Sequence, residues 1–157
     1  MPLCRPQGTF VVPAEAPTQG RPGSTVDTGL QGRTAIVTGA AQGIGQACAR
    51  ALAAEGAQVV CADLNVDGAV LAAAELGGVG VGVDVREPES CDALVREAVE
   101  RFGGVDVLVT CAGVFHATPL DRITAEEVAA IVVVLASDAA SYVHGAHVDV
   151  NGGLLMD

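Results

Sequence analysis

The sequence predicts an α/β domain built on a doubly wound parallel sheet of about five strands. Two observations predict this class. Short apolar runs rich in β-branched residues alternate with helical patterns from residue 33 onward, and this alternation is typical of a parallel sheet with helices on both faces. Glycine is frequent, with 20 of 157 residues, as expected for a chain with many tight connections between strands and helices.

The predicted strands are short apolar runs that cover residues 34–38, 58–63, 79–83, 105–110 and 146–150. Helical composition predicts helices over residues 44–55, 66–76, 88–102 and 125–135. Pro88 suits the first turn of its helix, and Gly56, Gly77 and Gly103 mark where helices end. We expect the last strand to lie beside the fourth, in the order 3-2-1-4-5, with helix 125–135 as the crossover connection.

Two segments differ sharply in composition. Residues 1–32 contain five of the seven prolines and show no periodicity, so we expect a disordered N-terminal tail. Residues 33–157 are expected to form one domain.

Composition and charge exclude several functions. The net charge of −11 disfavours nucleic acid and anionic membrane surfaces as partners. The chain has no lysine, which excludes the GxxxxGK[ST] phosphate loop. Its five cysteines lack CxxC spacing and its three histidines lack ligand spacing, so we expect thiols and no metal site. No secretory signal or apolar run of about 18 residues is evident, which favours a cytoplasmic location.

The strongest local signal is a glycine-rich turn between the first strand and the first helix. It reads Thr38-Gly39-Ala40-Ala41-Gln42-Gly43-Ile44-Gly45. Without side chains, the backbone turns tightly and approaches a pyrophosphate, while the helix N-terminus presents free N–H groups to that anion. Strand, turn and helix together predict a Rossmann-type nucleotide site.

Asp63 ends the second strand, 18 residues after Gly45. A carboxylate at this place accepts hydrogen bonds from ribose hydroxyls and repels a 2′-phosphate, so NAD is predicted over NADP. The alternative is that Asp63 only begins a turn.

With these residues in view, the sequence resembles the short-chain dehydrogenase/reductase family. Its nucleotide motif matches Thr38–Gly45, and its adenine-contacting acidic-apolar pair matches Asp84-Val85. Its "DVLVNNAG" strand resembles residues 105–113. Residues 135–145 and 150–153 resemble its C-terminal helix, turn and last strand. The resemblance implies the following cofactor-binding residues: Thr38, Gly39, Gln42, Gly43, Ile44, Gly45, Asp63, Leu64, Asp84, Val85, Cys111, Ala112 and Gly113.

The departures from the family concern catalysis. Thr110-Cys111 stands where the family has Asn-Asn, and Cys111 is expected to be a packed residue. The central segment that carries the family's catalytic Ser and Tyr-x-x-x-Lys pair is missing, with a seam near residues 124–128. The single tyrosine, Tyr142, has Ala146 four residues on in place of lysine. No catalytic residue is therefore predicted.

Three functions stay open at this stage. The first is an NAD-dependent oxidoreductase acting on a small alcohol or ketone, with impaired catalysis. The second is a non-catalytic NAD-binding or interaction module, which could form homo-oligomers through its C-terminal helix and strand. The third is a truncated product with no function of its own.

Overall fold

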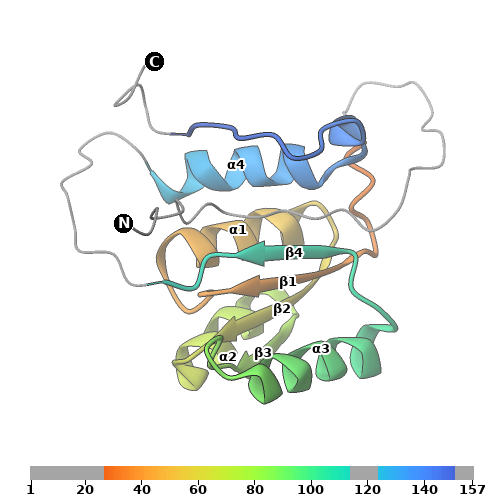
Figure 1. The fold of residues 1–157 in the computed structure, drawn as a ribbon. Coiled ribbons are helices and arrows are strands. Elements are labelled where there is room, and N and C mark those ends of the chain that lie inside the picture. The colour runs from red at the N-terminus through yellow and green to blue at the C-terminus, as the bar shows by residue number, and fades with distance from the viewer. Residues whose placement is uncertain (1–26, 114–123, 151–157) are drawn as a thin grey trace, which may run out of the picture.

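A computed structural model describes residues 27–113 and 124–150 as a parallel sheet with helices on both faces (Figure 1). The strands are β1 (Thr34–Thr38), β2 (Gln58–Asp63), β3 (Val79–Gly82) and β4 (Val107–Thr110). The helices are α1 (Gly43–Ala54), α2 (Val66–Leu76), α3 (Pro88–Phe102) and α4 (Ala125–Ala136), and a 3₁₀ turn follows at Asp138–Ala140. The predicted Rossmann-type α/β class is confirmed.

The sheet has the order β3-β2-β1-β4, and each neighbouring pair is parallel. β1 is central and every one of its residues is buried, which explains its unbroken apolar and β-branched sequence. This order matches the first four strands of the predicted sheet.

The predicted fifth strand is wrong. Residues 146–150 are described, but they pair with no strand, and the sheet has four strands within the described residues. In Figure 1 this segment runs on the side of α4 that faces away from the sheet. Because α4 packs against α1, it does not carry the chain back to the open edge of β4. Residues 146–150 therefore have no strand with which to form a ladder.

Two apolar clusters form the core, one on each face of the sheet. The larger one joins α1, α2 and α4 to the sheet and includes Val37, Leu52 and Val132. The smaller one lies under α3, where Leu94 and Ala98 pack on strand residues. The helices therefore cover both faces, as a doubly wound sheet requires.

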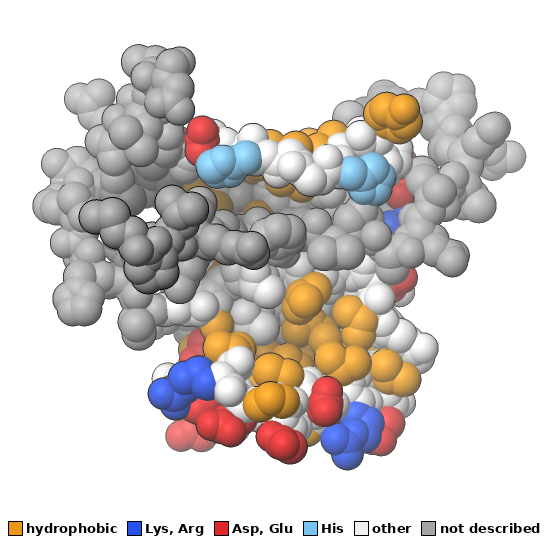
Figure 2. Space-filling view, in the orientation of Figure 1, with side chains coloured by type: hydrophobic (Ala, Val, Ile, Leu, Met, Phe, Trp, Pro, Cys, Tyr) orange, Lys and Arg blue, Asp and Glu red, His pale blue; other side chains and the backbone are white. Residues whose placement is uncertain are grey.

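Part of the α3 side of the sheet stays exposed. Along β4, Val107 and Val109 are buried, whereas Leu108 is exposed between them. Val95 and Val99 of α3 are exposed as well. Figure 2 shows apolar side chains gathered on this face of the molecule. An apolar surface of this kind is a risk for association.

Residues 27–32, which composition places in the tail, contact the domain. Leu30, placed in the tail by composition, is 0% exposed and belongs to the larger core cluster. The Gly32 N–H donates to the Gly56 carbonyl at 2.9 Å, and the Thr28 hydroxyl donates to Glu55 at 2.9 Å. The buried Leu30 side chain and these two hydrogen bonds therefore hold residues 27–32 against the domain. Residues 1–26 of the predicted tail lie outside the described part of the chain.

Candidate dinucleotide site

The turn after β1 and the first turn of α1 hold three glycines in different surroundings. Gly39 has a φ of 70°, and a Cβ there would lie 2.8 Å from the carbonyl carbon of Cys111. A Cβ on Gly45 would collide with the backbone of Gly39. Gly43 has a φ of 57°, yet no described atom lies within 4 Å of the place its Cβ would take. Two glycines are therefore required by backbone packing, while Gly43 borders open space.

The N-terminus of α1 is not capped by a side chain. Its N-cap residue, Gln42, makes no side-chain capping hydrogen bond, and the first turn of α1 contains no acidic residue. By contrast, Thr124 and Glu127 form a capping box on α4. The first N–H groups of α1, with the exposed Ile44 beside them, are consequently available to an anion.

Asp63 holds the glycine turn against the end of β2. Its Oδ2 accepts a hydrogen bond from the Ala41 N–H at 3.0 Å, and its Oδ1 accepts from the Asn65 N–H at 2.9 Å. The Ala40 N–H donates to the Ala62 carbonyl at 3.2 Å. Each carboxylate oxygen keeps a second lone pair for another donor. A half-buried carboxylate is thereby fixed beside the turn.

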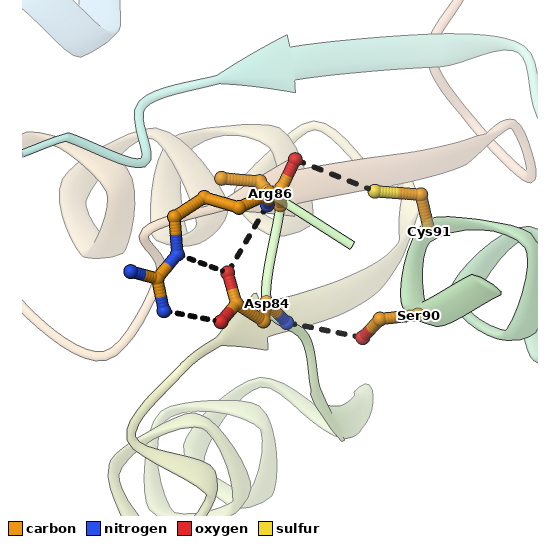
Figure 3. A network of polar contacts seen from close by, with 5 residues as sticks. Asp84, Arg86, Ser90 and Cys91 are labelled. Atoms are coloured by element: carbon orange, nitrogen blue, oxygen red, sulfur yellow. Dashed lines mark hydrogen bonds and ion pairs between the residues drawn. The ribbon is translucent and has the colours of Figure 1, made fainter. Parts of the chain in front are cut away.

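A second acidic residue follows β3. Asp84 accepts a hydrogen bond from Nε of Arg86 at 2.8 Å and one from the Arg86 backbone at 3.1 Å, and its own N–H donates to Ser90 Oγ at 3.0 Å (Figure 3). The hydrogen bond from the Arg86 side chain lowers the pKa of Asp84 from 3.8 to about 2. Beside this pair, Val85 is exposed, and its carbonyl accepts from the Cys91 thiol at 3.9 Å.

The end of β4 is joined to the end of β1. The Cys111 N–H donates to the Thr38 carbonyl at 3.2 Å, and the Ala112 N–H donates to Thr38 Oγ1 at 3.2 Å. The Thr38 side chain is buried, so its hydroxyl is a fixed acceptor. Gly113 follows as an exposed residue.

The structure brings the predicted cofactor residues to one edge of the sheet, because parallel strands end on the same side. They divide among the β1–α1 turn, the end of β2, the segment after β3 and the end of β4. In that order they are Thr38, Gly39, Gln42, Gly43, Ile44 and Gly45; Asp63 and Leu64; Asp84 and Val85; and Cys111, Ala112 and Gly113.

The tyrosine and the two histidines of the described residues all lie in the C-terminal segment that follows α4. Tyr142 is 98% exposed and follows the 3₁₀ turn after α4, and Ala146 stands four residues after it. His147 lies 3.3 Å from Asp149 in the same C-terminal segment, which also contains His144. His116 lies outside the described residues.

Metal binding and membrane insertion find no support in residues 27–113 and 124–150. No group of three or more His, Cys, Asp or Glu side chains is arranged there to hold a metal ion. None of the helices described has the length and apolar character needed to cross a membrane.

Two contributors to the site are not among the residues that the sequence predicts. The Ala41 N–H fixes the Asp63 carboxylate, and nothing in the sequence distinguishes this alanine from its neighbour. Arg86 was also missed, although its charge, opposite to that of Asp84 two residues earlier, is a signal that a search for local ion pairs would find.

A four-stranded parallel sheet with a glycine turn and an acidic strand end at one edge defines a Rossmann-type α/β domain. The chain belongs to the short chain dehydrogenase family, whose sequence profile matches residues 33–145. The predicted family is therefore confirmed.

The relatives are oxidoreductases. The chain is 41% identical over 109 residues to an uncharacterised oxidoreductase of Mycobacterium bovis, covering 67% of this chain and 44% of that protein. It is 42% identical over 99 residues to sorbitol dehydrogenase of Cereibacter sphaeroides, covering 62% of this chain and 39% of the relative. The chain thus spans less than half the length of these relatives.

A solved structure supports the fold. The hydroxysteroid dehydrogenase of Escherichia coli superposes with a TM-score of 0.52 at 37% identity, over 60% of this chain and 42% of that one. The likeness again covers part of a larger protein.

Proposed function

We propose that this chain binds NAD(H) at the carboxyl edge of its sheet, as the dinucleotide-binding part of a short-chain dehydrogenase/reductase. The observation that carries the proposal is the Asp63 carboxylate, held beside the glycine turn by the Ala41 N–H at 3.0 Å. A carboxylate there accepts hydrogen bonds from ribose hydroxyls and repels a 2′-phosphate, so NAD is favoured over NADP.

The remaining contacts follow from the same edge. The open space at Gly43 and the uncapped N-terminus of α1 suit the pyrophosphate. Leu64 and the Asp84-Val85 pair would flank the adenosine, and residues 111–113 would line the other half of the dinucleotide. The buried Thr38 side chain supports this arrangement. Its hydroxyl accepts a hydrogen bond from the Ala112 N–H and so holds the end of β4 against the turn.

Hydride transfer by this chain is proposed to be impaired. A bound nicotinamide supplies or accepts the hydride, and the protein must orient the substrate and move a proton. The sequence has one tyrosine and no lysine, so no lysine of this chain can lower the pKa of the tyrosine hydroxyl. The relatives' catalytic segment is proposed to be missing at a seam near residues 124–128, and a small alcohol or ketone is the substrate class if turnover occurs.

Titration with NADH and NADPH tests the binding proposal. NADH should bind more tightly than NADPH, and Asp63→Asn should weaken NADH binding by about tenfold or more, because one charged acceptor is lost. Asp67→Asn is the matched control, since Asp67 is an exposed carboxylate in the first turn of α2. Equal affinity for both dinucleotides, or a folded chain that binds neither at millimolar concentration, would contradict the proposal.

Turnover is measured separately. The chain is incubated with NAD and a panel of small alcohols, and NADH formation is followed by absorbance. We expect no formation above the uncatalysed rate. Sustained turnover, proportional to the concentration of this chain, would show that another group replaces the missing proton donor.

A second candidate, self-association, is favoured by one observation. Val134 on α4 is 53% exposed, and an apolar side chain on an outer helix face suits a partner helix. Sedimentation velocity of the native chain and of Val134→Asp tests this candidate. A dimer that dissociates in the variant would support it, and a monomer for both would exclude it.

A further inference from the structure

Two cysteines that are far apart in the sequence meet beneath the glycine turn. Cys48 lies in α1 and is 0% exposed, within the larger core cluster. Cys111 directly follows β4 and packs against that same cluster. This contact follows from the alternation of side chains along β4. Val107 and Val109 point into the cluster, and Cys111 is the next residue on the same face.

The two thiols interact directly. A hydrogen bond between the Cys48 and Cys111 side chains is the largest cause that raises the pKa of Cys48, and burial adds to it. Cys61, by contrast, has its pKa raised to about 11 by burial alone. The described cysteines are all thiols, with no disulfide among them.

We propose that Cys48 and Cys111 are a modification site, a thiol pair that a small-molecule disulfide such as glutathione disulfide converts reversibly into an internal disulfide. The site needs no bound dinucleotide, so its test is independent of the function proposed above.

The chemistry runs in two exchange steps. Cys111, the half-exposed partner, loses its proton, and its thiolate attacks one sulfur of the glutathione disulfide, expelling a glutathione thiolate. Cys48 then loses its proton, attacks the Cys111 sulfur of the mixed disulfide and expels the second glutathione. The two cysteines together lose two protons and two electrons, and the glutathione disulfide takes up both electrons and becomes two thiols.

Accessibility determines the order of these steps. Buried Cys48 cannot meet glutathione disulfide directly, whereas Cys111 is partly exposed. The hydrogen bond with the Cys111 thiol, the largest cause of the raised pKa of Cys48, is lost in the mixed disulfide, but burial still raises that pKa. The attack by Cys48 is therefore the slow step and should accelerate as the pH rises. The product would join α1 to the end of β4, next to the contact between Gly39 and Cys111.

The test uses the native chain. Trypsin cleaves after arginine, and it places each cysteine in a different peptide: residues 1–33, 34–50, 51–86, 87–96 and 102–122. The folded chain is equilibrated with glutathione disulfide, remaining thiols are blocked by alkylation, and the linked peptides are identified by mass spectrometry. We expect peptide 34–50 joined to peptide 102–122 as the main product, with a mass loss of about 2 Da from the intact chain.

Two controls make the assignment specific. Cys91→Ser removes the other half-exposed cysteine of the described residues and should leave the link unchanged. The same oxidation in concentrated guanidinium should lose the preference for this pair, because the fold no longer brings the two thiols together. Oxidation of the folded chain that leaves Cys48 alkylatable after unfolding, or that links the peptides without preference, would overturn the proposal.

Discussion

Replacing Gly43 by alanine separates the cost of backbone strain from a contact with the dinucleotide. Gly43 has a φ of 57°, in the left-handed region, and no described atom lies within 4 Å of the place its Cβ would take. The added methyl group therefore meets no protein atom of the described residues. It would instead occupy the space proposed for the pyrophosphate.

The expected loss of stability comes from the backbone alone. A left-handed conformation costs an L-residue roughly 1–2 kcal/mol, and the smaller unfolded-state entropy of alanine offsets about 0.5 kcal/mol of this. The net loss is about 1 kcal/mol. In a domain of this size it lowers the melting temperature by about 4 °C.

Gly77→Ala is a matched control. Gly77 has a φ of 68°, and no described atom lies within 4 Å of its Cβ position either. It caps the C-terminus of α2, at the opposite end of that helix from Asp63. Its replacement should cost the same free energy of unfolding without touching the proposed site.

The assay is an NADH titration combined with thermal melts of the three proteins. Both variants should melt about 4 °C lower than the native chain. Only Gly43→Ala should lose NADH affinity, by about 30-fold or more, which corresponds to about 2 kcal/mol. Equal NADH affinity of Gly43→Ala and Gly77→Ala would show that the pyrophosphate does not lie beside Gly43.

Three further changes test the structure. Arg33→Ala removes the 2.7 Å ion pair with Asp138, which joins the residue before β1 to the turn after α4. We expect a loss of about 1 kcal/mol in urea unfolding, and no change would mean that the pair adds nothing to stability. Thr124→Ala breaks the capping box of α4 and should cost about 1 kcal/mol, read from the melting temperature. Arg86→Ala should return the pKa of Asp84 from about 2 towards 3.8, followed by NMR of the carboxyl carbon. Because the folded pKa is lowered, the stabilisation by this pair is present above pH 3.8 and is lost as the pH falls through about 2, so the native chain and Arg86→Ala should differ least in strong acid.

The local pattern of the sequence determined most of the elements and the residues of the candidate site. Buried parallel strands are short apolar runs, so β1 and β2 were predicted with the bounds they have. The glycine turn follows from its position between a strand and a helix. Residues that end parallel strands share one edge, so the sequence alone places Asp63 near that turn. The hydrogen bond from the Ala41 N–H is a detail of the structure.

Only the tertiary structure decided which distant segments meet. The pattern of residues 146–150 suits a strand, but α4 packs against α1, so this segment has no strand edge beside it. Leu30 stands in a stretch rich in proline and glycine, yet the core buries it. Nothing in the sequence indicates that Cys48 and Cys111, which lie far apart along the chain, pack against the same cluster. Periodicity reports which face of an element is apolar, whereas pairing depends on the surface that another part of the chain presents, and that surface exists only after folding.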